Sequence, residues 1–306
     1  MDIILPFMLD NGFSRGVYIN ADKTISDILA CHSYPQIVES VVAQTIVLTL
    51  ALSANLKFNG TFSLNIRGGG PIQTIFVSAT NDKKVRAYAV YDNDKLPQQD
   101  TSLTNQDLFG NGELLFSVSQ IGQEPYQGII QLTQNSLIET VLDYFRQSEQ
   151  IKTNLVLRQD GKKVRCILLQ QMPLKQDIEP EQANDLWETE NVLLESVRNT
   201  ELFDDKLTPQ EILYRLFHAN TATVFDGQTP EFSCPCHRSQ MEKFLKKMSD
   251  EEREPLYQDG KIITECQFCQ NQLHLQRKIS NAFFNYFLFH IVIKCLSGTS
   301  IKSFYG

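Results

Sequence analysis

The most apolar stretch of the chain lies near its N-terminus and predicts a helix. Between residues 35 and 56, Val, Ile, Leu and Ala recur at positions that would fall on every side of a helix, and Glu39 is the only charged residue. A surface helix has one apolar face, whereas a helix that is apolar nearly all round belongs inside a protein. The pattern therefore predicts a helix buried between layers of sheet.

The segments that follow this helix alternate between apolar and polar residues and predict strands. Residues 61–67 place Phe, Leu and Ile on one face and Thr, Ser and Asn on the other. Gly68-Gly69-Gly70-Pro71 predicts a hairpin turn that uses the conformational freedom of glycine, with strands at 72–79 and 85–91 after it. The glycines lack the Gly-Lys-Ser/Thr ending of a phosphate loop, so a nucleotide site is not predicted.

The order helix, strand, turn, strand recurs further along the chain. Ser136-Leu137-Ile138-Glu139 has the pattern of a capping box and opens a helix through residue 147. Strands at 153–158 and 163–170 follow, with Asp160-Gly161 between them. Residues 1–177 are therefore predicted to form one α+β domain, in which β-sheets pack around a buried helix.

Residues 178–230 form an acidic middle segment in which two helices are predicted. Eleven acidic against three basic residues give it a charge of −8, equal to the net charge of the whole chain. Thr208-Pro209-Gln210-Glu211 has the cap and first-turn proline of a helix start. The apolar positions are Leu186, Leu193, Val197, Leu213, Leu216 and Phe217. They favour two solvated helices packed on the main domain. The functional alternative adds that this apolar stripe is weakly held, so that it can detach.

Four of the seven cysteines stand in two close pairs in the last third of the chain. Cys234-Pro235-Cys236 and Cys266-Gln267-Phe268-Cys269 are separated by 29 residues. Four thiolates in two such pairs suit one tetrahedral Zn²⁺, with Cys234, Cys236, Cys266 and Cys269 as ligands. Residues 231–275 are too few to be held by apolar burial alone, whereas zinc supplies about 10 kcal/mol or more in small zinc peptides.

The same four thiols allow more than one role. A permanent zinc knuckle would only fold its domain, whereas thiolates that oxidise to disulfides release the metal, so the site can also act as a trigger. A disulfide framework is not favoured, because nothing in the sequence suggests secretion, and seven cysteines, one an odd remainder, fit a reducing compartment better than an oxidising one. No basic cluster precedes the short apolar run at 3–9, and no uninterrupted apolar run reaches about 18 residues. We therefore expect neither a signal peptide nor a membrane span, and a cytoplasmic protein.

The cysteine pattern and several other stretches together resemble the 33 kDa chaperonin family. The stretches are Leu56-Lys57-Phe58-Asn59-Gly60, Gly69-Gly70-Pro71, Pro125-Tyr126-Gln127-Gly128, Tyr144-Phe145-Arg146-Gln147-Ser148-Glu149-Gln150 and Leu169-Gln170-Gln171-Met172-Pro173. The resemblance covers about residues 1–275. Gly161-Lys162-Lys163 departs from the family, which has a pair of glycines at this turn.

The resemblance implies a redox-regulated holdase chaperone of the heat-shock response. It implies a client-binding and dimerisation domain at 1–177, a helical linker at 178–230 that covers a hydrophobic surface, and a zinc redox-switch domain at 231–275. By resemblance, peroxide or hypochlorite together with heat forms the disulfides Cys234–Cys236 and Cys266–Cys269, and zinc is lost. The family then dimerises, binds unfolding client proteins without ATP, and passes them to ATP-dependent refolding chaperones.

Two alternatives from other classes follow from the cysteines. A constitutive zinc ribbon that binds protein or nucleic acid would normally have a basic face, but residues 231–275 carry six basic and eight acidic residues, so nucleic acid is not an expected partner. A thiol oxidoreductase could use Cys266-x-x-Cys269, a motif that usually sits between a strand and a helix. No Ser-His-Asp order and no metallopeptidase or nucleotide motif is present, so an enzyme is not expected.

The remaining segment, residues 276–306, has no counterpart in the family resemblance. It contains four basic residues and no acidic one, and its apolar run at 282–293 is interrupted by Asn285 and His290. The run is shorter than a membrane span. Docking on the main domain, association between chains and disorder all remain open for this tail.

Overall fold

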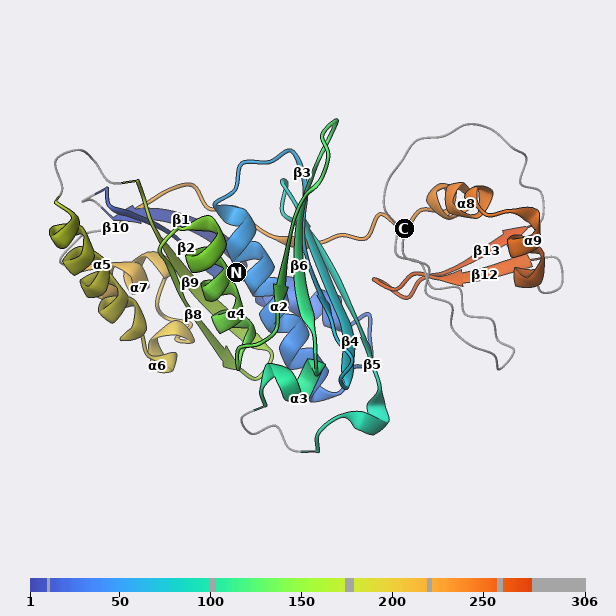
Figure 1. Ribbon diagram of the computed structural model, residues 1–306, viewed down its shortest axis with the longest axis horizontal. Coiled ribbons are helices and arrows are strands. Elements are labelled where there is room, and N and C mark those ends of the chain that lie inside the picture. Colours follow the sequence, from blue (N-terminus) through green and yellow to red (C-terminus); the bar gives the residue numbers. More distant parts are fainter. Residues whose placement is uncertain (10–11, 99–102, 174–178, 219–221, 258–260, 277–306) are drawn as a thin grey trace. The chain divides into compact units, whose positions relative to one another are not determined.

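The computed structural model describes residues 1–276 except for 10–11, 99–102, 174–178, 219–221 and 258–260 (Figure 1). The chain divides into two compact units, Met1–Phe232 and Ser233–Gly306, the second of which is described up to Gln276. The tail predicted at 276–306 therefore lies, apart from its first residue, outside the described residues.

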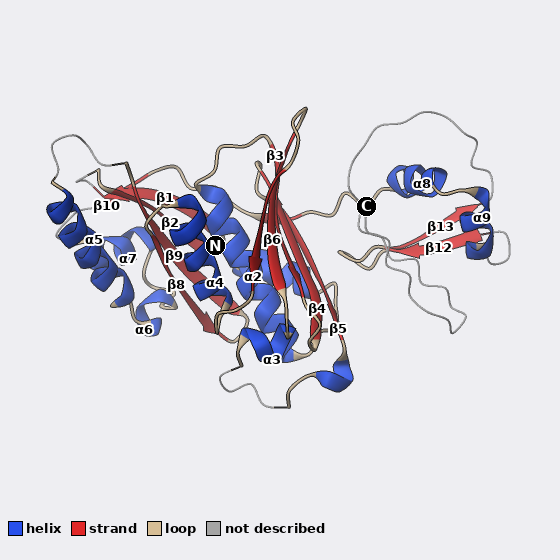
Figure 2. Ribbon diagram, in the orientation of Figure 1, coloured by secondary structure: helices blue, strands red, loops and turns tan. Residues whose placement is uncertain are grey.

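The first unit contains two sheets that lie on either side of a long helix (Figure 2). The five strands of sheet A, all antiparallel, are in order β10 (Ala222–Val224), β1 (Ile3–Leu9), β2 (Ser14–Asn20), β9 (Lys163–Gln171) and β8 (Thr153–Asp160). The six strands of sheet B are in order β11 (Glu231–Phe232), β5 (Lys84–Tyr91), β4 (Ile72–Thr80), β3 (Gly60–Arg67), β6 (Glu113–Gln120) and β7 (Tyr126–Gln131). Only β11, which runs parallel to β5, departs from the antiparallel pattern of sheet B.

Helix α2 (Gln36–Ala54) is the buried helix that the apolar stretch predicted. It lies between the two sheets, and its side chains join residues of both sheets in one main core (Figure 1). The hydroxyls of Thr45 and Thr49 donate to the carbonyls of Val41 and Thr45 four residues earlier, so these buried polar groups are satisfied within the helix. The helix is long and apolar enough to cross a membrane, yet 72% of its most apolar window is buried inside the unit, as in a core helix.

The triple glycine joins β3 to β4, as predicted, but for a different physical reason. A Cβ atom on Gly68 would lie 2.3 Å from the carbonyl oxygen of Phe109, and one on Gly70 would lie 2.6 Å from the backbone nitrogen of Gly110. These two glycines are therefore needed because the backbone at the end of α3 (Asn105–Phe109) approaches closely, rather than for a left-handed turn. A short 3₁₀ turn, Asn93–Lys95, follows β5.

The helix predicted to open at Ser136 forms, with two corrections. The Ser136 hydroxyl accepts from the N–H of Glu139, but the Glu139 carboxylate accepts from Asn135, so the capping is not reciprocal. The α-helical part, α4 (Leu137–Tyr144), ends early and continues as a π-helical turn, Phe145–Glu149. The turn brings Glu149 back to the hydroxyls of Tyr144 and Tyr126, both of which donate to its carboxylate.

The linker helices cover the face of sheet A that is turned away from α2 (Figure 1). They are α5 (Pro180–Glu195), α6 (Asn199–Leu202) and α7 (Pro209–Leu216). The remaining helix of the first unit, α1 (Asp22–Leu29), precedes α2 and is not part of the linker. Leu213, Leu216 and Phe217 are buried, as the apolar stripe predicted. Along α5, however, Leu186 and Leu193 are only half-buried, and the deepest positions are Ala183, Glu190 and Leu194. The buried face of α5 includes the carboxylate of Glu190, so a prediction from the spacing of hydrophobic residues alone assigned the wrong face.

The second unit is small and has a correspondingly small core. Its elements are α8 (Arg238–Lys247), α9 (Asp250–Arg253), the 3₁₀ turn Glu254–Leu256, β12 (Lys261–Glu265) and β13 (Gln272–Gln276). Helix α8 begins at Arg238 with His237 as its N-cap. Pro255 lies in the 3₁₀ turn that ends α9. Among the described residues, only Leu245, Ile262 and Leu275 form its buried apolar cluster.

Candidate metal centre

The structure brings the four predicted cysteines together into one cluster. Their Sγ atoms all lie within 4.8 Å of one another, and no disulfide joins them. The shortest separations link the two motifs: Cys234 Sγ lies 3.5 Å from Cys266 Sγ, and Cys236 Sγ lies 3.1 Å from Cys269 Sγ. Each motif thus supplies one sulfur to each close pair. The cluster therefore brings together the two ends of the segment between Cys234 and Cys269.

The second cysteine pair is held by a tight turn between β12 and β13. The N–H of Cys266 donates to the carbonyl of Asn271, and the N–H of Gln270 donates to the carbonyl of Cys266. Gln270 has φ of 54°, a left-handed conformation that tightens the turn. The N–H groups of Cys269 and Phe268 point at the sulfur of Cys266, so the backbone itself stabilises a thiolate there.

The thiols of the cluster differ in acidity because they share hydrogen bonds. The hydrogen bond from the Cys234 thiol lowers the pKa of Cys266 below its ordinary value, and the backbone N–H groups add to this effect. The same hydrogen bond, together with burial, raises the pKa of Cys234, and burial raises the pKa of Cys269. These donors therefore favour the thiolate form of Cys266.

The arrangement of the sulfurs fits a tetrahedral metal ion. A Zn–S bond of about 2.3 Å places neighbouring sulfurs of a tetrahedron about 3.8 Å apart. The close pairs at 3.1 and 3.5 Å and the limit of 4.8 Å bracket this spacing. Four thiols without a carboxylate or imidazole among them are a soft donor set of the kind found in structural zinc sites. The four cysteines can hold one metal ion.

The surroundings of Cys266-x-x-Cys269 do not match those of a thiol oxidoreductase. Such a motif usually lies between a strand and a helix. Here it lies in the turn of a hairpin, between β12 and β13. All four sulfurs are also gathered in one cluster, which is the arrangement of a metal site rather than of a single exposed redox pair.

The other two described cysteines lie away from the cluster. Cys166 is fully buried in β9, and burial raises its pKa to about 12. Cys31 is half-buried after the end of α1, where its thiol contacts the carbonyl of Asp27 at 3.5 Å. The ring of the neighbouring His32 stacks on Tyr34, with 4.5 Å between ring centroids.

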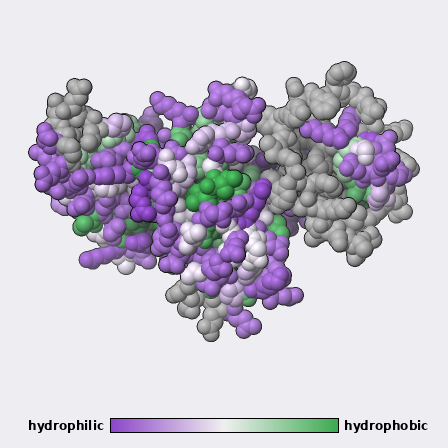
Figure 3. Space-filling model, viewed as in Figure 1, coloured by the Kyte–Doolittle hydropathy of each residue, from purple (hydrophilic) through white to green (hydrophobic). Residues whose placement is uncertain are grey.

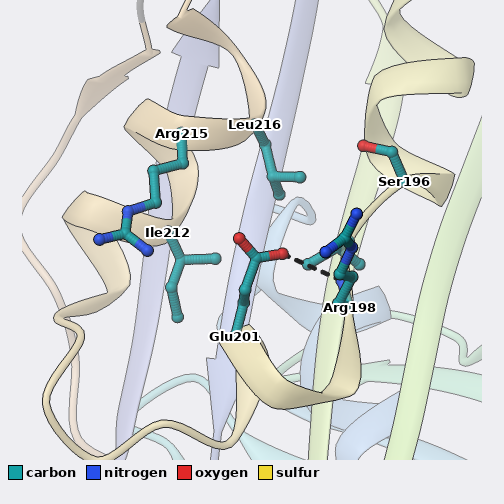
Figure 4. A pocket seen from close by; sticks show the side chains of 7 residues that line it. Ser196, Arg198, Glu201, Ile212, Arg215 and Leu216 are labelled. Atoms are coloured by element: carbon teal, nitrogen blue, oxygen red, sulfur yellow. Dashed lines mark hydrogen bonds between the residues drawn. The ribbon is translucent and has the colours of Figure 1, made fainter.

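A cavity of about 370 Å³ lies among the linker helices, separate from the cysteines (Figure 4). The carboxylate of Glu201 lies between the guanidinium groups of Arg198 and Arg215, and Ile212 and Leu216 line its apolar wall. One carboxylate between two guanidinium groups offsets part of their charge. The cavity therefore lacks the uniformly positive lining of a phosphate site.

Sequence reasoning missed the groups that position the ligands. Phe268 is buried, and its backbone N–H points at Cys266, while the left-handed residue after the motif is Gln270. Glycine or asparagine at this position would have signalled the turn, and glutamine does not. Backbone donors of this kind have no signature in the side-chain sequence.

Comparison with known proteins places the whole described chain in one family. A family model described as Hsp33 protein matches residues 2–276. The chain belongs to the Hsp33 family. The 33 kDa chaperonin of Nitrosococcus oceani is 32% identical over 277 residues, covering 90% of this chain and 92% of the relative. That of Shewanella loihica is 31% identical over 271 residues, covering 88% and 91%. The chain is therefore an Hsp33-type chaperone, a class that binds client proteins, and the resemblance drawn from its motifs is confirmed.

The fold agrees with a solved Hsp33 structure. The crystal structure of the 33 kDa chaperonin from Thermotoga maritima superposes with a TM-score of 0.75 at 18% identity, covering 90% of this chain and 96% of that one. The predicted fold class is confirmed: an α+β protein with sheets around a buried helix, together with a C-terminal cysteine cluster.

Proposed function

We propose that this Hsp33-family chain is an ATP-independent holdase that is switched on by oxidation. One observation carries the proposal: four sulfurs lie within 4.8 Å of one another in a unit whose described residues, up to Gln276, form a buried apolar cluster of only three side chains. So small a core does not hold such a unit folded by itself. Chemistry at the sulfurs therefore decides whether the second unit is folded, and this is the basis of a switch.

The reduced protein would hold one Zn²⁺ through Cys234, Cys236, Cys266 and Cys269. When bound, the ion would supply folding free energy, about 10 kcal/mol or more by comparison with small zinc peptides. The chain's own part is to place the thiolates. The hairpin turn fixes Cys266 and Cys269, and the backbone N–H groups of Phe268 and Cys269 favour the ionised form of Cys266.

Oxidation would remove the metal ligands in two balanced steps. Each step joins two thiols as a disulfide, with loss of two protons and two electrons, and reduces one peroxide to two waters. Two peroxides therefore convert the four thiols into two disulfides. A disulfide sulfur lacks the anionic charge of a thiolate ligand, so metal binding ends, and with it the stabilisation of the second unit.

We propose the pairing Cys234–Cys236 and Cys266–Cys269, as in the family that the chain resembles. The closest sulfurs in the folded cluster belong to different motifs, Cys234 with Cys266 and Cys236 with Cys269. Disulfides between the motifs would link them covalently and would keep the second unit closed after the metal is lost. Pairing within each motif leaves no covalent bond between the motifs, and so permits the opening that the switch requires.

Opening of residues 231–275 would remove support from the linker at 178–230, which covers the outer face of sheet A. That face carries Leu5, Phe7 and Leu9 of β1, all buried under the linker side chains. Uncovered, it would be a large apolar surface for unfolding clients on the domain at 1–177. Tyr126 and Ile129 of β7 are already 56% and 61% exposed, and Figure 3 shows apolar side chains gathered over β6 and β7.

The rest of the proposal follows the family. The oxidised chain would dimerise, hold clients in the cytoplasm without catalysing a reaction, and release them to ATP-dependent chaperones once reduced. No ATP site is needed for holding alone.

The decisive test is aggregation of a heat-denatured client protein, followed by light scattering. The peroxide-treated chain should suppress aggregation, whereas the reduced, zinc-loaded chain should not. Zinc content and circular dichroism, recorded before and after peroxide, should show release of one zinc and loss of structure. Equal suppression by the two forms, or full activity with zinc still bound, would reject the switch.

A further inference from the structure

The segment at residues 222–232, here called the strap, provides the last strand of both sheets. Its first part, β10, pairs antiparallel with β1 at the edge of sheet A. Its last part, β11, pairs parallel with β5 at the edge of sheet B. One extended segment therefore covers two strand edges, and it ends two residues before Cys234.

Backbone hydrogen bonds hold the strap along β1. The N–H of Phe225 donates to the carbonyl of Pro6 at 2.9 Å. Gln228 and Ile4 exchange two bonds, at 2.7 and 2.9 Å. Of the side chains along β1, Ala222 and Val224 are half-buried against the linker cluster, whereas Phe225 is half exposed and Gln228 is exposed. A segment held by backbone pairing with little apolar burial is among the first to detach.

At the edge of β5 the strap also uses side chains, in alternation. Pro230 is buried, Glu231 is exposed, and Phe232 is half-buried against the main core. The N–H of Glu231 donates to the carbonyl of Lys83 at 3.1 Å, and the hydroxyl of Thr24 lies 2.9 Å from the carbonyl of Pro230. The edge of β5 thus accepts an extended backbone whose apolar side chains recur at every second residue.

The first part of the strap covers the edge of β1, a strand with apolar side chains on both faces. Ile4 of β1 lies in the main core, while Leu5 and Phe7 lie in the cluster under the linker. An uncovered edge of such a strand presents unpaired N–H and carbonyl groups, and it is a ready template for another extended chain.

We propose that the edges of β1 and β5 are client-binding sites, which take up extended, apolar segments of unfolding proteins by β-strand addition once the strap detaches. The inference rests on the proposed holdase function and names how its clients are held. The occupant is argued from the strap itself, which shows that each edge accepts an extended backbone. A client would replace it, pairing its own backbone with the open strand.

The test uses a labelled peptide with the sequence of residues 222–233 and the full-length chain. In an extended strand, whether its partner runs antiparallel as β1 does or parallel as β5 does, successive N–H groups point to opposite sides. One probe carries N-methyl groups on Phe225 and Glu231, whose N–H groups donate to the edges. The control probe carries them on the neighbours Val224 and Phe232, so both probes have the same side chains and the same number of methyl groups.

The oxidised chain should bind the unmodified and the control peptides with similar affinity, and the donor-methylated peptide at least about tenfold more weakly, because two backbone hydrogen bonds are lost. The first two peptides in excess should also reduce suppression of client aggregation. Equal binding or equal competition by the donor-methylated peptide would show apolar adhesion instead of strand pairing, and would overturn the inference.

A variant of the chain tests whether the strap is the cover. Gln228→Pro removes the N–H that donates to Ile4, whereas Gln228→Ala keeps it. The reduced, zinc-loaded Gln228→Pro chain should bind the unmodified peptide, and the Gln228→Ala chain should not. Hydrogen exchange at Phe225 and Glu231 reports whether the strap has opened, and an open strap without peptide binding would overturn the inference.

These outcomes separate the inference from the function on which it rests. If the oxidised chain fails to suppress aggregation when no peptide is present, the holdase proposal itself fails. If it suppresses aggregation and the peptides neither bind nor compete, only the assignment of clients to the strand edges fails.

Discussion

At the scale of single residues, Cys266 is the most deeply placed of the four clustered cysteines. It is buried, whereas the other three are half-buried, and it accepts hydrogen bonds from Cys234 and from two backbone N–H groups. These donors favour its thiolate, the form that binds metal. Replacement of Cys266 is therefore the sharpest single-residue test of the proposed metal site.

We expect Cys266→Ser to abolish stoichiometric zinc binding and to unfold the second unit in the reduced protein. A serine hydroxyl stays protonated and is a poor zinc ligand, so a three-thiolate site remains. Zinc content by colorimetric assay and proteolysis after residue 232 measure the two effects. Cys31→Ser is the matched control and should keep one zinc per chain, because Cys31 lies in the first unit. A Cys266→Ser chain that still binds one zinc would contradict the assignment.

The thiol of Cys166 should be unreactive in the folded protein. Burial raises its pKa from 9.0 to about 12. Because the unfolded thiol ionises first, its contribution to stability is complete below about pH 9 and is lost as the pH rises toward 12. Alkylation at pH 8, followed by mass spectrometry, should modify half-buried Cys31 well before Cys166. Equal rates in the native protein would show that β9 opens readily.

At the scale of elements, helix α7 has one face on sheet A and one in solvent. Leu213 and Phe217 are fully buried, and the ring of Phe217 lies 5.8 Å from that of Phe7 on β1. Tyr214, between them in sequence, is 63% exposed. The linker covers the apolar outer face of sheet A. The strength of the contact between α7 and this sheet should therefore set how easily the linker detaches.

We expect Phe217→Ala to weaken linker packing by about 3–5 kcal/mol and to let the chain hold clients at lower temperature or with less oxidant. The matched control, Tyr214→Ala on the exposed face of the same helix, should change stability by at most about 0.5 kcal/mol. Client aggregation measured over a temperature series separates the variants. If both behaved alike, detachment of α7 would not be part of activation.

Strand β9 is tied to helix α1 by a buried ion pair. The Arg165 guanidinium makes two hydrogen bonds to the Asp22 carboxylate, and it lies 5.4 Å from the ring centre of Phe203 in the linker. Its side chain is 5% exposed, whereas that of Asp22 is 29% exposed. One group thus joins the sheet, a helix and the linker.

Replacement of this arginine should destabilise the first unit. We expect Arg165→Met to cost about 2–3 kcal/mol, below the 3–5 of a fully buried pair because Asp22 retains some solvent. Lys163→Met, on the same strand, breaks only the exposed pair with Asp205 at 3.8 Å and should cost less than about 0.5 kcal/mol. Urea unfolding gives both values, and similar losses would contradict this reading.

At the scale of the whole molecule, the two units should differ in what stabilises them. The first has an extensive core built around α2, whereas the described part of the second has one cluster of three buried apolar side chains, a buried Phe268 and four clustered cysteines. A chelator added to the reduced protein should therefore unfold residues 233–276 and leave the sheets of the first unit protected. Hydrogen exchange before and after chelation checks this, and zinc added back should restore the structure. Protection that persists in β12 and β13 without metal would contradict it.

Much of the fold and of the site could be predicted because each depended on local patterns. The helix α2 is apolar on every side, the hairpin strands alternate, and Cys-x-Cys with Cys-x-x-Cys is a ligand spacing that few other sites share. Glu190 shows where such patterns stop. It lies on the buried face of α5 and accepts a hydrogen bond from Ser14 of β2, a partner 176 residues away. Periodicity alone assigns a glutamate to the solvent.

By itself the sequence determined which residues could be ligands, which helix had to be buried, and which family the chain resembles. These properties follow from residue type and spacing within a few turns of chain. Only the tertiary structure decided that residues 222–232 cover an edge of both sheets, that Gly68 and Gly70 make room for α3, and which sulfurs lie closest. Each of these depends on contacts between segments distant in sequence, and packing, rather than local preference, selects such contacts.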